Sequence, residues 1–64
     1  MAAEDGSRDV YFEFTAIGRT VKVSAIDSAT GLEVSVVGPA SALQSDLQRL
    51  ALQKLKAQLS RRFP

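Results

Sequence analysis

The residue types on which most enzyme and metal sites depend are missing from this sequence. Its 64 residues include neither histidine nor cysteine. These absences exclude a zinc site of thiolate and imidazole ligands, a disulfide framework, and any nucleophile that histidine activates. The sequence also lacks a GxGxxG motif and a Walker loop. We therefore predict that the protein is not an enzyme and has no catalytic, cofactor-binding or metal-binding residue.

Two polar pairs remain whose spacing suits acid–base or nucleophilic chemistry. Lys22 and Ser24 are two residues apart, which places both side chains on the same solvated face of a strand. Glu13 and Glu33 are expected on that outer face as well, and paired carboxylates perform acid–base catalysis where a pocket encloses them. On an open sheet, we expect these glutamates to form a cross-strand charge ladder with Lys22 instead.

Three strands, at residues 10–17, 20–26 and 32–37, are predicted from the alternation of apolar and polar residues. All three are rich in β-branched and aromatic residues, which favour strands. The apolar residues that we expect to share one buried face are Val10, Phe12, Phe14, Ala16, Val21, Val23, Ala25, Leu32, Val34 and Val36.

Two short turns that contain glycine are expected to join these strands into an antiparallel meander. Neighbouring strands share an apolar face if the first turn is a type II′ loop at Gly18–Arg19, which pairs Phe14 with Val23. The second connection, DSATG, is expected to be a type I turn followed by Gly31 in the left-handed conformation. It pairs Val23 with Val36.

One helix is predicted from Ala42 to about Arg61, where leucine, alanine, glutamine, lysine and arginine dominate. Gly38–Pro39 ends the third strand, and Ser41 followed by Gln44 has the spacing of a capping box. The ridge that we expect to pack on the sheet consists of Leu43, Leu47, Ala51, Leu55 and Leu59.

Together these elements predict an α+β fold, a three-stranded antiparallel meander followed by one C-terminal helix (βββα). We expect a single domain over residues 9–64, and a disordered tail over residues 1–8, which are small and charged. A chain this short buries only about 60% of its unfolded surface, so self-association is an expected source of added stability.

Two apolar surfaces are predicted to remain for a partner. The apolar arc of the helix is about 200° wide, whereas packing on one sheet face uses little more than about 100°. The surplus stripe consists of Leu52, Leu55, Leu59 and Phe63, and the outer sheet face adds Tyr11, Ile26 and Val37. We predict that these residues mediate a homodimer or contact another protein. The first and third strands are both expected to be free edges that can accept a further strand.

Nucleic-acid binding is the alternative, because charge is unevenly distributed along the chain. Residues 47–64 contain five basic and no acidic residues, whereas residues 1–46 contain three basic and seven acidic ones. The candidate phosphate contacts are Arg49, Lys54, Lys56, Arg61 and Arg62. The outer sheet face offers one cation, Lys22, beside two glutamates that repel phosphate, so we prefer the protein interaction.

The start of the sequence, MAAEDGSRD, is polar and lacks the apolar region of a signal peptide. No run approaches the roughly 18 to 20 apolar residues of a membrane span. We predict a cytoplasmic protein with no membrane partner and no cofactor.

A family resemblance rests on the run VYFEF…G…VKVSAID…TGLEVSVVGPAS, which extends with the following leucines over residues 10 to about 59. The run resembles a family of small alphaproteobacterial proteins of unknown function. This resemblance implies a bacterial cytoplasmic origin and brings no activity, ligand or catalytic residue with it. Within the run, Gly38–Pro39 is expected to form the corner between sheet and helix, with an anion site at the helix N-terminus as the alternative.

Overall fold

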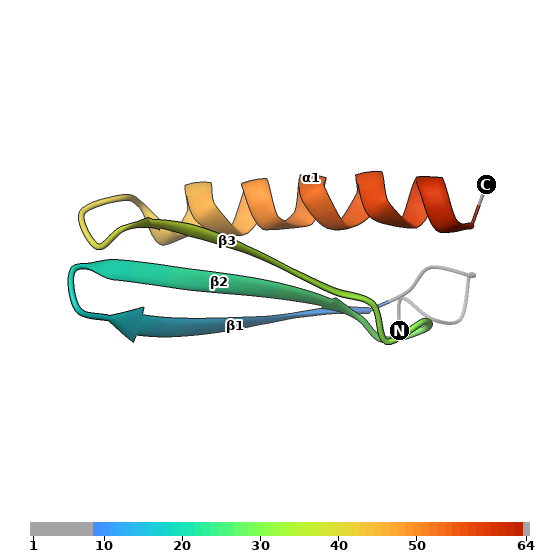
Figure 1. Ribbon diagram of the computed structural model, residues 1–64, viewed down its shortest axis with the longest axis horizontal. Helices are drawn as coiled ribbons and strands as arrows, with labels where there is room; N and C mark the ends of the chain where they lie inside the picture. The colour runs from blue at the N-terminus through green and yellow to red at the C-terminus, as the bar shows by residue number, and fades with distance from the viewer. Residues whose placement is uncertain (1–8, 64) are drawn as a thin grey trace.

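Two layers make up the fold, an open antiparallel sheet and one helix that lies across a face of the sheet (Figure 1). The computed structural model describes residues 9–63, so the predicted tail at residues 1–8 lies outside the described residues, as does Pro64. The elements are β1 (Val10–Ile17), β2 (Thr20–Asp27), β3 (Glu33–Pro39) and α1 (Gln44–Arg62), with the strands in the order β1-β2-β3. The predicted βββα architecture is confirmed.

The first turn has the predicted geometry. Gly18 has φ 60°, whereas Arg19, like every other non-glycine residue in the described part of the chain, has a negative φ. A positive φ at the first central residue alone is the pattern of a type II′ turn. The register that follows pairs Phe14 with Val23 and Val23 with Val36, as predicted.

The second connection, residues 28–31, is held by a dense set of hydrogen bonds. Gly31 has φ 76°, the left-handed conformation that was predicted, and its N–H donates to the Asp27 carbonyl oxygen at 2.8 Å. The Asp27 N–H donates to the Leu32 carbonyl oxygen at 2.8 Å. The Asp27 carboxylate also accepts hydrogen bonds from the N–H of Thr30 at 3.0 Å and from its hydroxyl at 2.7 Å. One residue therefore joins the end of β2 to both sides of the loop.

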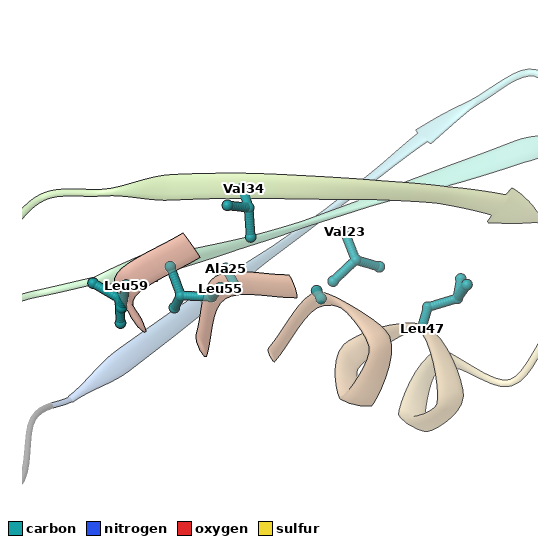
Figure 2. Close-up of a cluster of buried hydrophobic side chains, with 7 residues drawn as sticks. Val23, Ala25, Val34, Leu47, Leu55 and Leu59 are labelled. Atoms are coloured by element: carbon teal, nitrogen blue, oxygen red, sulfur yellow. The ribbon is translucent and has the colours of Figure 1, made fainter. Parts of the chain in front are cut away.

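The core lies between the helix and the β2–β3 part of the sheet (Figure 2). Odd-numbered residues of β2 and even-numbered residues of β3 point toward the helix, as the alternation predicts, and α1 contributes one residue per turn. The buried apolar side chains are Val23, Ala25, Val34, Leu47, Ala51, Leu55 and Leu59. Partly buried side chains around them are Val10, Phe12, Val21, Leu32, Val36 and Ala42.

The helix begins two residues later than predicted, and the expected capping box is absent. Leu43 is the N-cap, with extended backbone and no hydrogen bond from a side chain. The Ala42 N–H instead donates to the Pro39 carbonyl oxygen at 2.9 Å, so a separate turn occupies the stretch that contains Ser41. Leu43 is consequently exposed and does not belong to the ridge that packs on the sheet.

Gly38 is buried where β3 passes beneath the first turns of the helix. A Cβ atom at this position would lie 2.5 Å from Leu47 Cδ2 and 3.3 Å from Leu47 Cδ1. The glycine therefore allows close packing of α1 on β3. Because the helix begins only at Gln44, the Gly38–Pro39 corner is not at the helix N-terminus, and the geometry does not support an anion site there.

We expect the substitution Gly38→Ala to lower the free energy of unfolding by about 1 kcal/mol, because the added methyl group displaces the buried Leu47 side chain. Urea unfolding followed by circular dichroism measures the change. Val37→Thr, at the exposed neighbouring position, is the control and should change stability by less than about 0.5 kcal/mol. An alanine variant as stable as the native chain would show that Leu47 can move without loss.

Candidate functional site

The helix covers β2 and β3 and leaves the inner face of β1 largely uncovered. Its contacts are mainly with these two strands, and β1 is the strand farthest from α1 in Figure 1. Phe14 is 41% exposed although its side chain belongs to the apolar face, Ala16 is also exposed, and Phe12 is half-buried. Our expectation that one helix would bury the whole apolar face is therefore wrong for the second half of β1.

A groove of about 460 Å³ lies between the C-terminal half of the helix and the start of β1. Its lining residues are Val10, Leu52, Leu55, Lys56, Leu59, Ser60 and Phe63. Five of these side chains are apolar, and the charge of Lys56 and the hydroxyl of Ser60 lie on exposed residues. A groove of this size and composition suits an apolar group that enters from the β1 side.

The structure brings together the four helix residues predicted as an interaction stripe, since all four line the groove. Leu55 and Leu59, however, are buried in the core of the protein and serve its own packing. Leu52 is half-buried and Phe63 is 55% exposed, so these two side chains remain for a partner.

The free edge of β1 presents backbone groups that follow the apolar side chains. The Ser28 N–H donates to the Asp9 carbonyl oxygen at 3.0 Å, which places odd-numbered residues of this strand at the hydrogen-bonded positions facing β2. The N–H and C=O groups of Val10, Phe12, Phe14 and Ala16 therefore point away from β2. None of these residues is charged or proline, and the one charged side chain of β1, Glu13, lies on the outer face.

The opposite edge of the sheet, at β3, is partly occupied. The Asp27–Leu32 hydrogen bond directs the backbone groups of odd-numbered β3 residues outward. Lys54 Nζ donates to the outward carbonyl oxygen of Ser35 at 2.7 Å, and Pro39 has no N–H to offer. A lysine and a proline on an edge are common devices against strand addition. Both β1 and β3 are edge strands, as predicted, and at β3 one outward carbonyl oxygen is already occupied by Lys54.

The outer face of the sheet does not gather its apolar residues into one patch. Tyr11 lies opposite Ile26 at one end of the face, whereas Val37 lies opposite Lys22 at the other end. Between them, the hydroxyl groups of Ser24 and Ser35 are hydrogen-bonded at 2.8 Å. The predicted outer-face surface is therefore divided in two by a polar centre.

The predicted charge ladder across the sheet is not formed. Glu13 lies opposite Ser24 and Glu33 lies opposite Ile26, whereas Lys22 lies opposite Thr15 and Val37. Within residues 9–63, no ion pair joins Lys22 to either glutamate. The register separates the two carboxylates, and the buried Ser24 hydroxyl is hydrogen-bonded to that of Ser35.

The five predicted phosphate contacts point to different sides of the helix. Arg49 pairs with Asp46, and Lys54 bonds to the β3 edge. Lys56 faces the groove on the β1 side, while Arg61 and Arg62 are in the last turn, where cations interact favourably with the helix dipole. Two of the five cations are thus already bonded within the protein, and nucleic-acid binding stays a prediction.

A protein-family model described as "Domain of unknown function (DUF6898)" matches residues 7–62. The chain belongs to this family. The DUF6898 match covers all three strands and the whole helix, in agreement with the resemblance to a family of unknown function, whereas the alphaproteobacterial origin stays a prediction. No curated protein and no solved structure matches the chain.

In this DUF6898 chain, sequence reasoning missed Phe14 as a surface residue and Val10 as part of a groove. The alternation assigns both to the apolar face, and that assignment is correct. One helix is too narrow to cover three strands, so an edge strand stays exposed on its apolar face. The alternation does not indicate that this strand is β1.

Two further findings concern the described residues 9–63 of this DUF6898 chain. They contain no group of three or more histidine, cysteine, aspartate or glutamate residues placed to hold a metal ion. No helix among these residues is both long enough and apolar enough to cross a membrane.

Proposed function

We propose that the protein is a non-catalytic module that assembles with a second copy of itself, and that the two copies join through β1. The observation that carries this proposal is the difference between the two sheet edges. The edge at β1 combines free backbone groups with an uncovered apolar face, whereas at β3 the helix covers the apolar face, Lys54 occupies one outward carbonyl oxygen and Pro39 lacks an N–H.

Pairing of β1 with β1 of a second copy satisfies the backbone and the side chains together. In an antiparallel pair related by a two-fold axis, even-numbered residues of one strand bond to even-numbered residues of the other. The apolar faces of the two sheets then lie on the same side. The product is a continuous six-stranded sheet with both helices on one face, and the exposed Phe14 side chains lie between the helices.

A second copy suits this edge better than a foreign strand or a small substrate. A foreign strand alone would leave Phe14 and Phe63 exposed, whereas a second copy brings its own apolar cover to them. The groove offers a substrate one ionisable side chain, Lys56, among its lining residues, with no acidic or basic partner beside it in that lining. Acid–base chemistry usually requires a positioned pair.

The test is the mass of the protein in solution, measured by sedimentation velocity from about 1 to 100 µM. We expect twice the 6.9 kDa mass of one chain at the upper concentrations. Phe14→Lys places a charge in the middle of the proposed junction and should weaken association at least about tenfold, equivalent to about 1.4 kcal/mol.

The matched control is Val37→Lys, because Val37 is 66% exposed and lies on the other edge strand. This variant should associate as the native chain does, and circular dichroism should show that both variants are folded. A native chain that sediments as a monomer at 100 µM, or a Phe14→Lys variant that dimerises normally, would contradict the proposal.

A further inference from the structure

The groove and the exposed Phe14 side chain are complementary features of the same apolar face. The groove opens beside Val10 at the start of β1, whereas Phe14 lies four residues further along the same strand. Antiparallel pairing brings the start of one strand beside the later part of the other. We infer that the groove of each copy receives Phe14 of the second copy, and that this insertion sets the register of the dimer. The inference rests on the proposed function.

Four registers keep the apolar faces together and pair most of the strand, with two-fold axes through Phe12, Glu13, Phe14 or Thr15, because only pairs of equal parity leave the apolar residues on one side. The register centred on Thr15 carries Val10 past the end of β1 of the second copy and leaves the groove without an occupant, so three registers remain. The register centred on Glu13 places this glutamate directly opposite its own copy. Like charges at facing positions destabilise a sheet, so this register is disfavoured.

The register centred on Phe14 leaves the groove without an occupant. It places the two Phe14 side chains opposite each other at the axis, and Val10 then lies opposite Gly18 of the second copy. Glycine has no side chain to fill a groove lined by Leu52, Leu59 and Phe63. Most of the apolar groove surface would stay in contact with water.

The register centred on Phe12 fills the groove. It places Val10 opposite Phe14 of the second copy, and both side chains lie on the face that carries the helices. The benzyl group then reaches the apolar wall formed by Leu52 and Phe63, where ring-to-ring contact adds to the burial of apolar surface. Symmetry creates this contact twice. On the outer face, Glu13 lies opposite Tyr11 of the second copy, a pair without like charges.

Disulfide trapping distinguishes the three registers, because the native chain contains no cysteine. In the inferred register, residues 11 and 13 of different copies face each other at a non-hydrogen-bonded position, with Cα atoms about 4.5 Å apart. This separation suits a disulfide. We therefore expect a mixture of the Tyr11→Cys and Glu13→Cys variants to form a mixed disulfide, identified by its intact mass, when oxidised at dimer concentrations.

Two matched mixtures report the other registers. Tyr11→Cys mixed with Thr15→Cys traps the register centred on Glu13 and retains both glutamates, and Glu13→Cys mixed with Thr15→Cys traps the register centred on Phe14. All three residues are exposed on the outer face, so the substitutions leave the core unchanged. We expect at least about tenfold more mixed disulfide from the first pair, because the alternative pairs are displaced along the strand beyond disulfide reach.

A fluorescent apolar anion, anilinonaphthalene sulfonate, tests whether the groove is filled. The native dimer should bind it weakly, whereas Phe14→Ala, which removes the occupant, should bind it several-fold more strongly. A native dimer that gives the Tyr11–Glu13 disulfide and excludes the probe supports the inference. A dimer that traps another register, or that binds the probe as well as the Phe14→Ala variant does, overturns the inference and leaves the proposed function standing. A monomer at every concentration overturns both.

Discussion

Replacement of Leu55 by alanine is expected to lower the free energy of unfolding by about 2–5 kcal/mol. Leu55 is 0% exposed and is among the largest fully buried side chains of the protein. It lies at the centre of the contact between α1 and the sheet, beside Ala25 and Val34 (Figure 2). A 64-residue domain has a total stability of only a few kcal/mol. The Leu55→Ala chain should therefore be largely unfolded at 25 °C.

Urea and thermal unfolding followed by circular dichroism measure this loss. The control is Leu50→Ala, the same change on the same helix at a position that is 52% exposed, where we expect a loss below about 1 kcal/mol. Equal losses from the two substitutions would contradict the core described above. Both variants should be measured at the same protein concentration, because self-association adds to the apparent stability of a folded chain.

The second large effect is expected at the loop between β2 and β3. Asp27→Ala removes the carboxylate that accepts hydrogen bonds from the Thr30 N–H and hydroxyl, and it leaves a buried position without its polar side chain. Hydrogen bonds to a charged acceptor contribute about 1.5–3 kcal/mol each. Because water can reach the exposed Thr30 groups in the variant, we expect a net loss of about 2–3 kcal/mol.

Two further variants test whether the Asp27 carboxylate itself is responsible for the loss. Ser28→Ala, at the exposed next position, should leave stability within about 0.5 kcal/mol of the native value. Asp27→Asn retains an acceptor oxygen for Thr30 and should restore part of the loss, since asparagine forms the same local turn. If Asp27→Ala unfolds at the native urea concentration, the carboxylate does not hold the loop.

The strands and turns could be predicted from the sequence because their causes are local. The alternation assigns each residue to a face, and the requirement for a positive φ places Gly18 and Gly31 at their turn positions. Once both turns are placed, the pairing of Phe14 with Val23 and of Val23 with Val36 follows without further information. Local chemistry was therefore sufficient for the strand order and the register.

The lateral position of the helix could not be predicted, because no local signal carries it. An apolar face three strands wide accepts a helix above either strand pair, and the choice depends on contacts between distant residues such as Gly38 and Leu47. This choice decides that Phe14 is exposed and that Lys54 reaches the β3 edge. The apolar stripe of the helix predicted most of the residues that line the groove. The groove itself forms only because the helix lies over β2 and β3.

The start of the helix shows how a local rule can fail. Ser41 and Gln44 have the spacing of a capping box, but the Ala40 N–H donates to the Arg19 carbonyl oxygen at 2.8 Å. This bond ties the segment between β3 and α1 to the first hairpin. The Pro39 carbonyl oxygen then accepts the hydrogen bond from the Ala42 N–H. A tertiary constraint therefore overrides the propensity of residues 42–43 to be helical.

The bond between Lys54 and Ser35 limits how large the proposed assembly can become. A protein whose sheet accepts a further strand at both edges can add copies indefinitely and form filaments or amyloid-like polymers. In the proposed dimer both β1 edges are paired, which leaves the two β3 strands as the edges of the six-stranded sheet. On each of these strands Lys54 occupies the Ser35 carbonyl oxygen, so we expect a rising concentration to increase the fraction of dimers without starting polymerisation.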